Sequence, residues 1–236
     1  MVVLNRIVAA YWRLRNSLPG SYEPERERLG HFVRPEDWVV DVGVNMGQYA
    51  SRLLRLVGKK GKVFGFEAAT ETFQIARCIL RNPAMELRKE ALGDVTGTVL
   101  LGLYGGESGM IEHGLSRIVS APDPKMMRTE SVPCLRLDDV LAQRPRTISF
   151  IKCDVEGFEV HVLRGGQRLI ENDRPVLLVE ISTSGNYCEI MTLLMPLGYV
   201  PYQLTAERTW REVARYEESW TNNFLLVPDS KSRLLC

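Results

Sequence analysis

One stretch constrains the fold more than any other: the apolar run of residues 38–42, which contains an aspartate and breaks into a loop with two glycines. Gly43 and Gly47 lie four residues apart, and without a Cβ they let the backbone approach a ligand closely. Residues 48–57 follow with apolar side chains at helical spacing. A strand, a glycine loop and a helix in this order indicate a nucleotide-type site at a helix N-terminus.

A second acidic residue strengthens this interpretation. Residues 63–67 form another apolar run, which ends on Glu67. A carboxylate at that point of the fold, about 20 residues after the loop, can accept hydrogen bonds from both hydroxyls of a ribose. The D-x-G-x-N-x-G spacing from Asp41 to Gly47 differs from the G-x-G-x-x-G dinucleotide fingerprint, which disfavours a nicotinamide oxidoreductase.

Length and charge narrow the class of protein. The 236 residues suit one α/β domain, for which we predict an N-terminal helical extension and connector over 1–35 and the main domain over 36–236. Thirty basic and 29 acidic side chains give a net charge of +1, which predicts no nucleic-acid partner and no polybasic membrane patch. The five cysteines are scattered without a C-x-x-C pair, which favours reduced thiols and a cytoplasmic location.

Residues 1–16 read as an amphipathic helix that is too short and too charged to span a membrane. We expect it to pack on the domain or on a second subunit, which would make a homodimer. Contact with a membrane surface is the minor alternative, and no stable membrane insertion is expected.

The remaining chain alternates strands with helices, which predicts a mostly parallel sheet covered on both faces. A third strand is expected at 85–92 and a helix at 158–170, and a β-arm with a long lid loop interrupts the alternation over 93–125. Ligands bind outside the carboxyl ends of strands in such sheets. Five acids stand at these predicted ends, although any one of them could instead cap the following helix: Asp41, Glu67, Glu90, Asp154 and Glu180.

These motifs together resemble the FkbM family of S-adenosylmethionine (SAM)-dependent methyltransferases, over about residues 22–228. The most specific segment is K-x-D-V-E-G-x-E, which begins at Lys152. Val44 and Ala68 depart from the family pattern, which has Ala and Pro there, and neither change removes a group that the ligand needs. The other matching segments are the 41–47 loop, Phe66-Glu67, residues 91–94, Leu137-Asp138, residues 162–166 and residues 174–180.

The resemblance implies a Rossmann-like class I methyltransferase fold, with a seven-stranded sheet whose last strand is antiparallel. It assigns the loop with Asp41, Gly43, Asn45 and Gly47 to the methionine part of SAM. It assigns Glu67, with Ala68 beside it, to the ribose, and Glu90 with Ala91 to the adenine. It also implies methyl transfer to a hydroxyl oxygen, commonly on a sugar or a polyketide-like secondary metabolite.

A neutral alcohol is a poor nucleophile, so the enzyme needs a general base or a divalent metal that acidifies the hydroxyl. Asp154 and Glu180 are hard oxygen ligands suited to Mg²⁺, with Glu156 as a third candidate. Asp154 and Glu156 are also candidate catalytic groups, and His113 in the long loop is the best histidine for a general base. The plainer alternatives are a cofactor-facing or capping role for Asp154 and a helix N-terminal charge for Glu156.

The sequence therefore predicts a SAM-dependent O-methyltransferase that acts on a small hydroxylated acceptor. A sugar or oligosaccharide is the first expectation, and a polyketide or other secondary metabolite is the second. The alternatives are a methyltransferase directed at nitrogen or at carboxyl groups and a SAM-binding module without catalysis.

Overall fold

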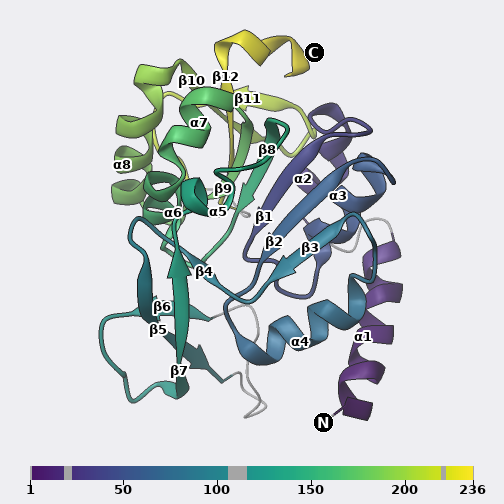
Figure 1. Cartoon of the computed structure of the whole chain (residues 1–236). Coiled ribbons are helices and arrows are strands. Elements are labelled where there is room, and N and C mark those ends of the chain that lie inside the picture. Colours follow the sequence, from purple (N-terminus) through teal and green to yellow (C-terminus); the bar gives the residue numbers. More distant parts are fainter. Residues whose placement is uncertain (1, 19–22, 106–115, 219–221, 236) are drawn as a thin grey trace.

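An eight-stranded sheet forms the centre of the molecule, with helices on both of its faces (Figure 1). The computed structural model describes residues 2–18, 23–105, 116–218 and 222–235. The strand order is β11-β10-β12-β9-β8-β1-β2-β3. The strands are β1 (Trp38–Val42), β2 (Lys62–Phe66), β3 (Met85–Arg88), β8 (Ile148–Cys153), β9 (Val176–Glu180), β10 (Tyr199–Leu204), β11 (Trp210–Glu212) and β12 (Asn223–Pro228).

Strand direction matches the expected class I arrangement. β3, β2, β1, β8 and β9 run parallel, and β12 lies antiparallel between β9 and β10. The short β11 pairs with β10 as a hairpin and adds an eighth strand to the seven expected. The chain leaves β1 toward β2 on one side and returns as β8 on the other, so a crevice for a ligand opens at the carboxyl ends of β1 and β8.

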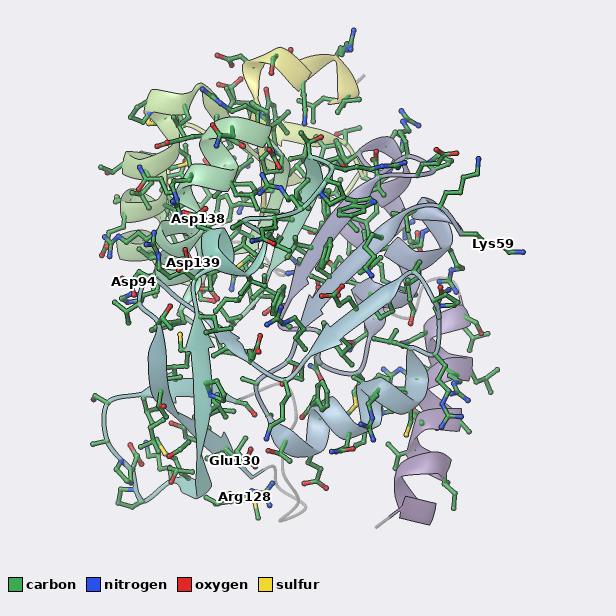
Figure 2. All side chains as sticks on the ribbon, in the orientation of Figure 1. Lys59, Asp94, Arg128, Glu130, Asp138 and Asp139 are labelled. Carbon is green, nitrogen blue, oxygen red and sulfur yellow. The ribbon has the colours of Figure 1, made fainter. Side chains whose placement is uncertain are left out.

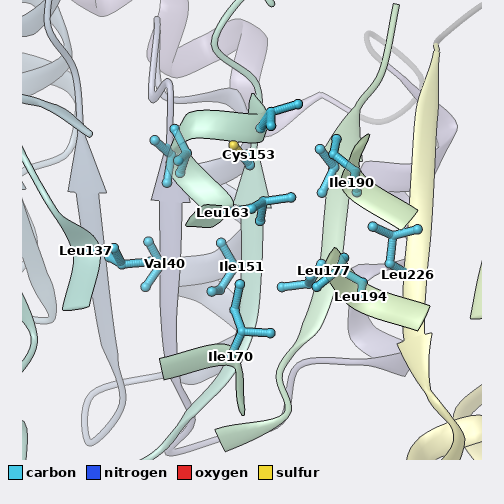
Figure 3. Packing of buried hydrophobic residues seen from close by; sticks show 14 of the residues in the cluster. Val40, Leu137, Ile151, Cys153, Leu163, Ile170, Leu177, Ile190, Leu194 and Leu226 are labelled. Atoms are coloured by element: carbon cyan, nitrogen blue, oxygen red, sulfur yellow. The ribbon is translucent and has the colours of Figure 1, made fainter. Parts of the chain in front are cut away.

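Each strand alternates its side chains between two helical layers, because successive residues of a strand point to opposite faces. Val39 and Phe150 pack in a cluster with α1 (Val2–Ser17), α3 (Gln48–Val57) and α4 (Thr70–Ile79). Val40, Ile151 and Leu177 face the other layer (Figure 3). That layer contains α5 (Leu137–Val140), α6 (Glu159–Gly165), α7 (Gln167–Asp173) and α8 (Ser184–Leu194).

The predicted β-arm is a second sheet of four strands, in the order β4-β7-β5-β6. Its strands are β4 (Ala91–Leu92), β5 (Gly97–Tyr104), β6 (Arg117–Val119) and β7 (Met126–Leu135). The expected strand at 85–92 is therefore divided, since β3 ends at Arg88 and β4 pairs with β7 instead. Glu130, labelled in Figure 2, accepts a 3.0 Å hydrogen bond from the Thr70 amide and so ties this sheet to the start of α4.

The helix expected at 158–170 breaks at Gly166 into α6 and α7. The buried carboxylate of Asp138 explains the break, because it accepts hydrogen bonds from the Arg168 and Leu169 amides at 3.2 and 2.9 Å (Figure 2). These amides belong to the first turn of α7, whose N–H groups have no partner within the helix. Asp138 of the Leu137-Asp138 motif thus stabilises the start of α7.

The N-terminal helix packs on the body of this chain, in contact with α4 and α3. Asn16 donates a 2.9 Å hydrogen bond to the Met46 carbonyl in the glycine loop, and Arg13 donates to the Ile79 carbonyl at the end of α4. The connector that follows forms the short helices α2 (Pro24–Arg28) and η1 (Leu29–His31). In the part of the chain that is described, every helix is too short or too polar to cross a membrane. The remaining short helices are η2 (Met195–Leu197) and η3 (Asp229–Leu235).

Candidate active site

A cavity of about 250 Å³ opens at the carboxyl ends of the central strands, where the strand order reverses. Residues from both sheets and from the connector before α2 line it. The lining residues are Glu23, Val42, Gly43, Val44, Asn45, Gln48, Tyr49, Phe66, Glu67, Ala68, Glu90, Ala91, Leu92, Leu101, Ser116, Ile118, Asp154, Val155, Glu156 and Glu180.

The glycine loop forms the floor of the cavity, and Gly43 is the tightest point. It has a φ of +81°, and a Cβ built on it would lie 1.8 Å from the carbonyl oxygen of Asp154. The Asp154 amide donates a 3.0 Å hydrogen bond to the Val42 carbonyl, which fixes the two segments against each other. A side chain at position 43 would therefore force the β1 loop away from the β8 loop.

Glu67 holds the loop from the other side. Its carboxylate accepts hydrogen bonds from the Asn45 amide at 2.8 Å and the Ala69 amide at 2.9 Å. Burial raises its pKa to about 7 against the effect of these amides. Asn45 Oδ1 and Ser116 Oγ are buried at this cavity without a partner among the described residues. Unpaired polar atoms of this kind fit a ligand that carries its own hydroxyl and amino groups.

Glu90 and Ala91 line the cavity where the main sheet passes into the second one. The Glu90 carboxylate forms a two-point ion pair with the Arg88 guanidinium, at 2.8 and 3.1 Å. Leu101 and Ile118 from β5 and β6 add apolar contacts on the same side. This part of the cavity suits a flat ring system.

Asp41 and Gly47 lie behind the cavity and do not line it. The Asp41 carboxyl group hydrogen bonds with the Ala50 amide in α3, and burial raises its pKa to about 7. Gly47, with a φ of +74°, is the residue before the first turn of α3. Six of the eight predicted cofactor residues thus surround the cavity, and these two support the loop.

A buried lysine organises the opposite half of the cavity. Lys152 Nζ lies 3.2 Å from Asp154 Oδ2 and 3.1 Å from Asn223 Oδ1, and 4.9 Å from the centre of the Tyr49 ring. Burial lowers the pKa of Lys152, but the carboxylates of Asp154, Glu23 and Glu180 outweigh burial and raise it above the ordinary value. The ammonium group therefore stays charged inside the protein.

Asp154, Glu156 and Glu180 can bring one carboxylate oxygen each within 4.8 Å of one another. Burial opposes ionisation of Asp154, yet Lys152 lowers its pKa below the ordinary value. Glu180 has the opposite shift, because burial and its hydrogen bond with Asp154 raise its pKa. The opposite directions of the two pKa shifts favour a pair that shares one proton, with the negative charge on the side of Lys152.

The loop after β8 presents Glu156 through two residues in the left-handed region. Glu156 has a φ of +55° and Gly157 a φ of +100°. Glu159 stabilises this loop by accepting hydrogen bonds from the Val155 and Gly157 amides at 3.0 and 3.1 Å. The pKa of Glu156 is raised to about 7 by burial and by the charges of Asp154 and Glu159.

No sequence motif identifies three residues of this half, which are Glu23, Tyr49 and Asn223. The Glu23 carboxylate accepts a 2.5 Å hydrogen bond from the Tyr49 hydroxyl and a 2.7 Å hydrogen bond from the Asn223 amide group. Asn223 pairs with Glu180 across β12 and β9. One signal could have led to them: Lys152 stands in an apolar strand, and a buried charge requires partners.

The histidines contribute little to the described cavity. His161 lies 2.9 Å from Asp94 Oδ2 and stacks on Phe158, and His31 contacts the Arg28 carbonyl, both outside the lining. His113 lies outside the described residues. Apart from Tyr49, the titratable groups that line the described part of the cavity are carboxylates.

Fold and site together define a class I SAM-dependent methyltransferase. The sequence profile of the methyltransferase FkbM domain matches residues 41–201, which is more than half of the chain. The chain therefore belongs to the FkbM family of methyltransferases. No curated protein matches it significantly in sequence.

One solved structure of this family shares the fold. The FkbM methyltransferase of Methylobacillus flagellatus KT is 17% identical with a TM-score of 0.54, over 86% of this chain and 50% of that one. The present chain thus spans half the length of that relative. More distant are a SAM-dependent O-methyltransferase of Thermotoga maritima (15% identity, TM-score 0.42, 87% and 64% covered) and a SAM-bound fibrillarin of Aeropyrum pernix (12%, 0.47, 83% and 67%).

Proposed function

We propose that this methyltransferase transfers the methyl group of SAM to a hydroxyl oxygen of a small neutral acceptor. A sugar or oligosaccharide is the first candidate, and a polyketide or other secondary metabolite is the second. The observation that carries the proposal is a cluster of three carboxyl side chains beside the glycine loop, those of Asp154, Glu156 and Glu180. In it, Glu156 has a pKa of about 7.

The cofactor half has the groups that SAM requires. Gly43 and Asn45 would hold the methionine part, Glu67 the ribose hydroxyls, and Glu90 with Ala91 the adenine. SAM supplies a methyl group on a positively charged sulfonium. The described lining contains acidic side chains and no basic one, and the acids that are ionised favour a cationic cofactor.

In this proposal Glu156 accepts the proton of the acceptor hydroxyl. A general base works best when its pKa lies near the working pH, and Glu156 meets this condition. Asp154 keeps its negative charge beside Lys152, and the protonated carboxyl group of Glu180 donates a hydrogen bond to Asp154. Asp154 and Glu180 position the acceptor, and within this cluster of three carboxyl groups Glu156 is the one whose pKa lies near neutrality.

The charge of the lining also supports a hydroxyl over the other acceptor classes. A carboxylate or phosphate on the acceptor would meet the negative charge of Asp154 and of ionised Glu156, while the Lys152 ammonium is already paired with Asp154. An amine would be held in its protonated form by the same carboxylates, and an ammonium has no lone pair for the attack. A neutral hydroxyl avoids both problems, and sugar hydroxyls can donate hydrogen bonds to the spare carboxylate oxygens.

A divalent cation such as Mg²⁺ is the second route to an acidic hydroxyl. Asp154 and Glu180, with Glu156 as a third ligand, offer the hard oxygen atoms that Mg²⁺ prefers. Such an ion would displace the proton held by Glu180. It would also lie close to the Lys152 ammonium, whose charge opposes cation binding.

A methyl-transfer assay with labelled SAM tests the proposal. Neutral glycosides, polyketide-like alcohols, amines and carboxylic acids are compared as acceptors, each with chelator and with added Mg²⁺. We expect label in an ether that survives mild alkali, and unchanged turnover with chelator if Glu156 is the base. Label in an alkali-labile ester or in an amine would overturn the proposal. Tight SAM binding by calorimetry without transfer to any acceptor would indicate a binding module, and binding of NAD in place of SAM would exclude the class.

A further inference from the structure

The outer face of α1 carries a row of exposed apolar side chains. Ile7, Tyr11, Leu14 and Leu18 are 64%, 56%, 65% and 49% exposed. Their spacing of four, three and four residues keeps them on one side of the helix and its last turn. They are four of the seven large apolar side chains that are exposed in the described parts of the chain, whereas Ala9 on the inner face is buried.

The same helix is basic. Residues 2–18 contain Arg6, Arg13 and Arg15 and no acidic residue. Arg13 donates to carbonyls at the end of α4, and the Arg15 guanidinium lies 5.1 Å from the centre of the Trp12 ring. Pairing two copies of this helix would bring arginines together without acids to neutralise them. Charge therefore disfavours a second copy of this chain as the occupant of the row.

A basic groove lies next to α1, where α3 and α4 end. This second cavity, of about 330 Å³, is lined by Arg55, Lys59 and Arg81, with no acidic side chain among the described residues of its lining. Ile79 also lines the groove and accepts the hydrogen bond of Arg13, so the groove and α1 are neighbours. Figure 2 shows Lys59 extending from the edge of the molecule along which α1 runs.

We propose that this edge, made of the apolar row on α1 and the basic groove, docks on the surface of an anionic phospholipid membrane. An apolar helix face settles at the boundary between headgroups and acyl chains, and nearby cations attract anionic headgroups. Both features are present here on adjoining elements. The attachment is peripheral, and it does not depend on which acceptor the enzyme methylates.

Docking would fix the orientation of the catalytic cavity, because α1 is tied to the cofactor loop. Asn16 donates to the Met46 carbonyl at 2.9 Å, and its own carbonyl accepts a 2.6 Å hydrogen bond from Arg26. Arg26 also donates to the Gln48 carbonyl at 2.9 Å. The membrane would thus contact a helix that is held by these hydrogen bonds to the first turn of α3.

Vesicle flotation of the full chain tests the proposal. We expect binding to mixed phosphatidylcholine–phosphatidylglycerol vesicles, weaker binding at high salt, and little binding to pure phosphatidylcholine. The pair Ile7→Ser, Leu14→Ser should weaken binding about a hundredfold, at about tenfold for each apolar side chain. The pair Lys59→Glu, Arg81→Glu should weaken it at least about 25-fold, at about fivefold for each lost cation. The control pair Val95→Ser, Met195→Ser removes exposed apolar side chains elsewhere and should leave binding unchanged.

Light scattering separates this proposal from a dimer. Wild-type protein that fails to bind anionic vesicles, or that binds both kinds of vesicle equally, would overturn the proposal. So would a dimer in solution that Leu14→Ser dissociates. Thermal unfolding and SAM binding equal to wild type show that the variants fold. The charge reversals change only exposed residues, so they report on docking even if the α1 variants are unstable.

Discussion

The two halves of the cavity are built by different means. The half that we propose for the cofactor, around Gly43, Glu67 and Glu90, depends on backbone geometry: a glycine at a point of close contact, and amides that Glu67 holds in place. The acceptor half depends on side-chain charge, with Lys152 at its centre and acids around it. The first half is therefore sensitive to shape, and the second is sensitive to the loss of single charges.

The largest effect is expected where the halves touch. Gly43→Ala places a Cβ 1.8 Å from the Asp154 carbonyl oxygen, a contact with backbone that no side-chain rotation relieves. We expect a loss of about 5 kcal/mol or more in the free energy of unfolding, and no measurable SAM binding. Urea unfolding and calorimetry measure the two effects.

Gly58→Ala is the matched control for this change. Gly58 also has a positive φ, of +66°, but no atom lies within 4 Å of a Cβ built there. Its φ of +66° and ψ of −163° lie in a region that glycine alone adopts readily, so its cost should be about 1 to 3 kcal/mol, from backbone strain alone. Equal losses in the two variants would show that the contact between the loops is not what requires a glycine at position 43.

The second prediction concerns the charge at the centre of the acceptor half. Lys152→Met leaves the partly buried Asp154 without its cation, so the free energy of unfolding should fall by up to about 3 kcal/mol near neutral pH. Lys152 lowers the pKa of Asp154, and the stability that this provides is present above the unfolded pKa and lost as pH falls through the folded pKa. The deficit of the variant should therefore shrink toward acidic pH.

Urea unfolding from neutral to acidic pH measures how much unfolding free energy the Lys152→Met variant loses, with Lys62→Met as control. Lys62 forms a 3.1 Å ion pair with Glu86 at the surface, and its loss should cost about 1 kcal/mol or less. A Lys152 deficit that does not change with pH would mean that the lysine acts through packing alone.

The same contrast explains what could be predicted from the sequence. The cofactor half is encoded by consecutive residues, so the 41–47 loop and Glu67 were identifiable, as was the class I fold. The strand pattern also placed Asp154 and Glu180 at strand ends, and the two strands lie side by side in the sheet. Asp41 was harder to place: its carboxyl group points to α3, which a motif cannot distinguish from a ligand contact.

The acceptor half could be predicted only in part, because distant segments complete it. Glu23 and Asn223 are 200 residues apart and meet at the Tyr49 hydroxyl and Lys152. The second sheet was underestimated because β4 and β7 pair in parallel across a long insertion. The basic groove could not be predicted from the sequence for a similar reason. A net charge of +1 does not show which cationic side chains the ends of α3 and α4 bring together.

The third prediction separates catalysis from cofactor binding. Glu156→Gln should lower kcat about a hundredfold, the lower end of the effect of a general base, with the Kd for SAM unchanged. In the wild type, kcat/KM should rise with pH and level off above about 7, because Glu156 must be ionised to accept a proton. Steady-state kinetics across pH measure both effects. A variant that keeps the pH dependence of the wild type would assign the ionisation to another group.

The smallest effect is expected at the outer edge of the cofactor half. Arg88→Ala removes the two-point partner of Glu90, a pair that is partly exposed and so worth about 1 kcal/mol or less. If Glu90 contacts the adenine, the Kd for SAM should rise by up to about fivefold, because the carboxylate is no longer held in one orientation. The value of kcat at saturating SAM should stay constant, since the acceptor half is untouched.

Lys60→Ala, which breaks the surface pair with Glu36, should change neither quantity. A fall in kcat with an unchanged Kd would show that the second sheet acts on the acceptor side, and the division of the cavity into two independent halves would then be wrong.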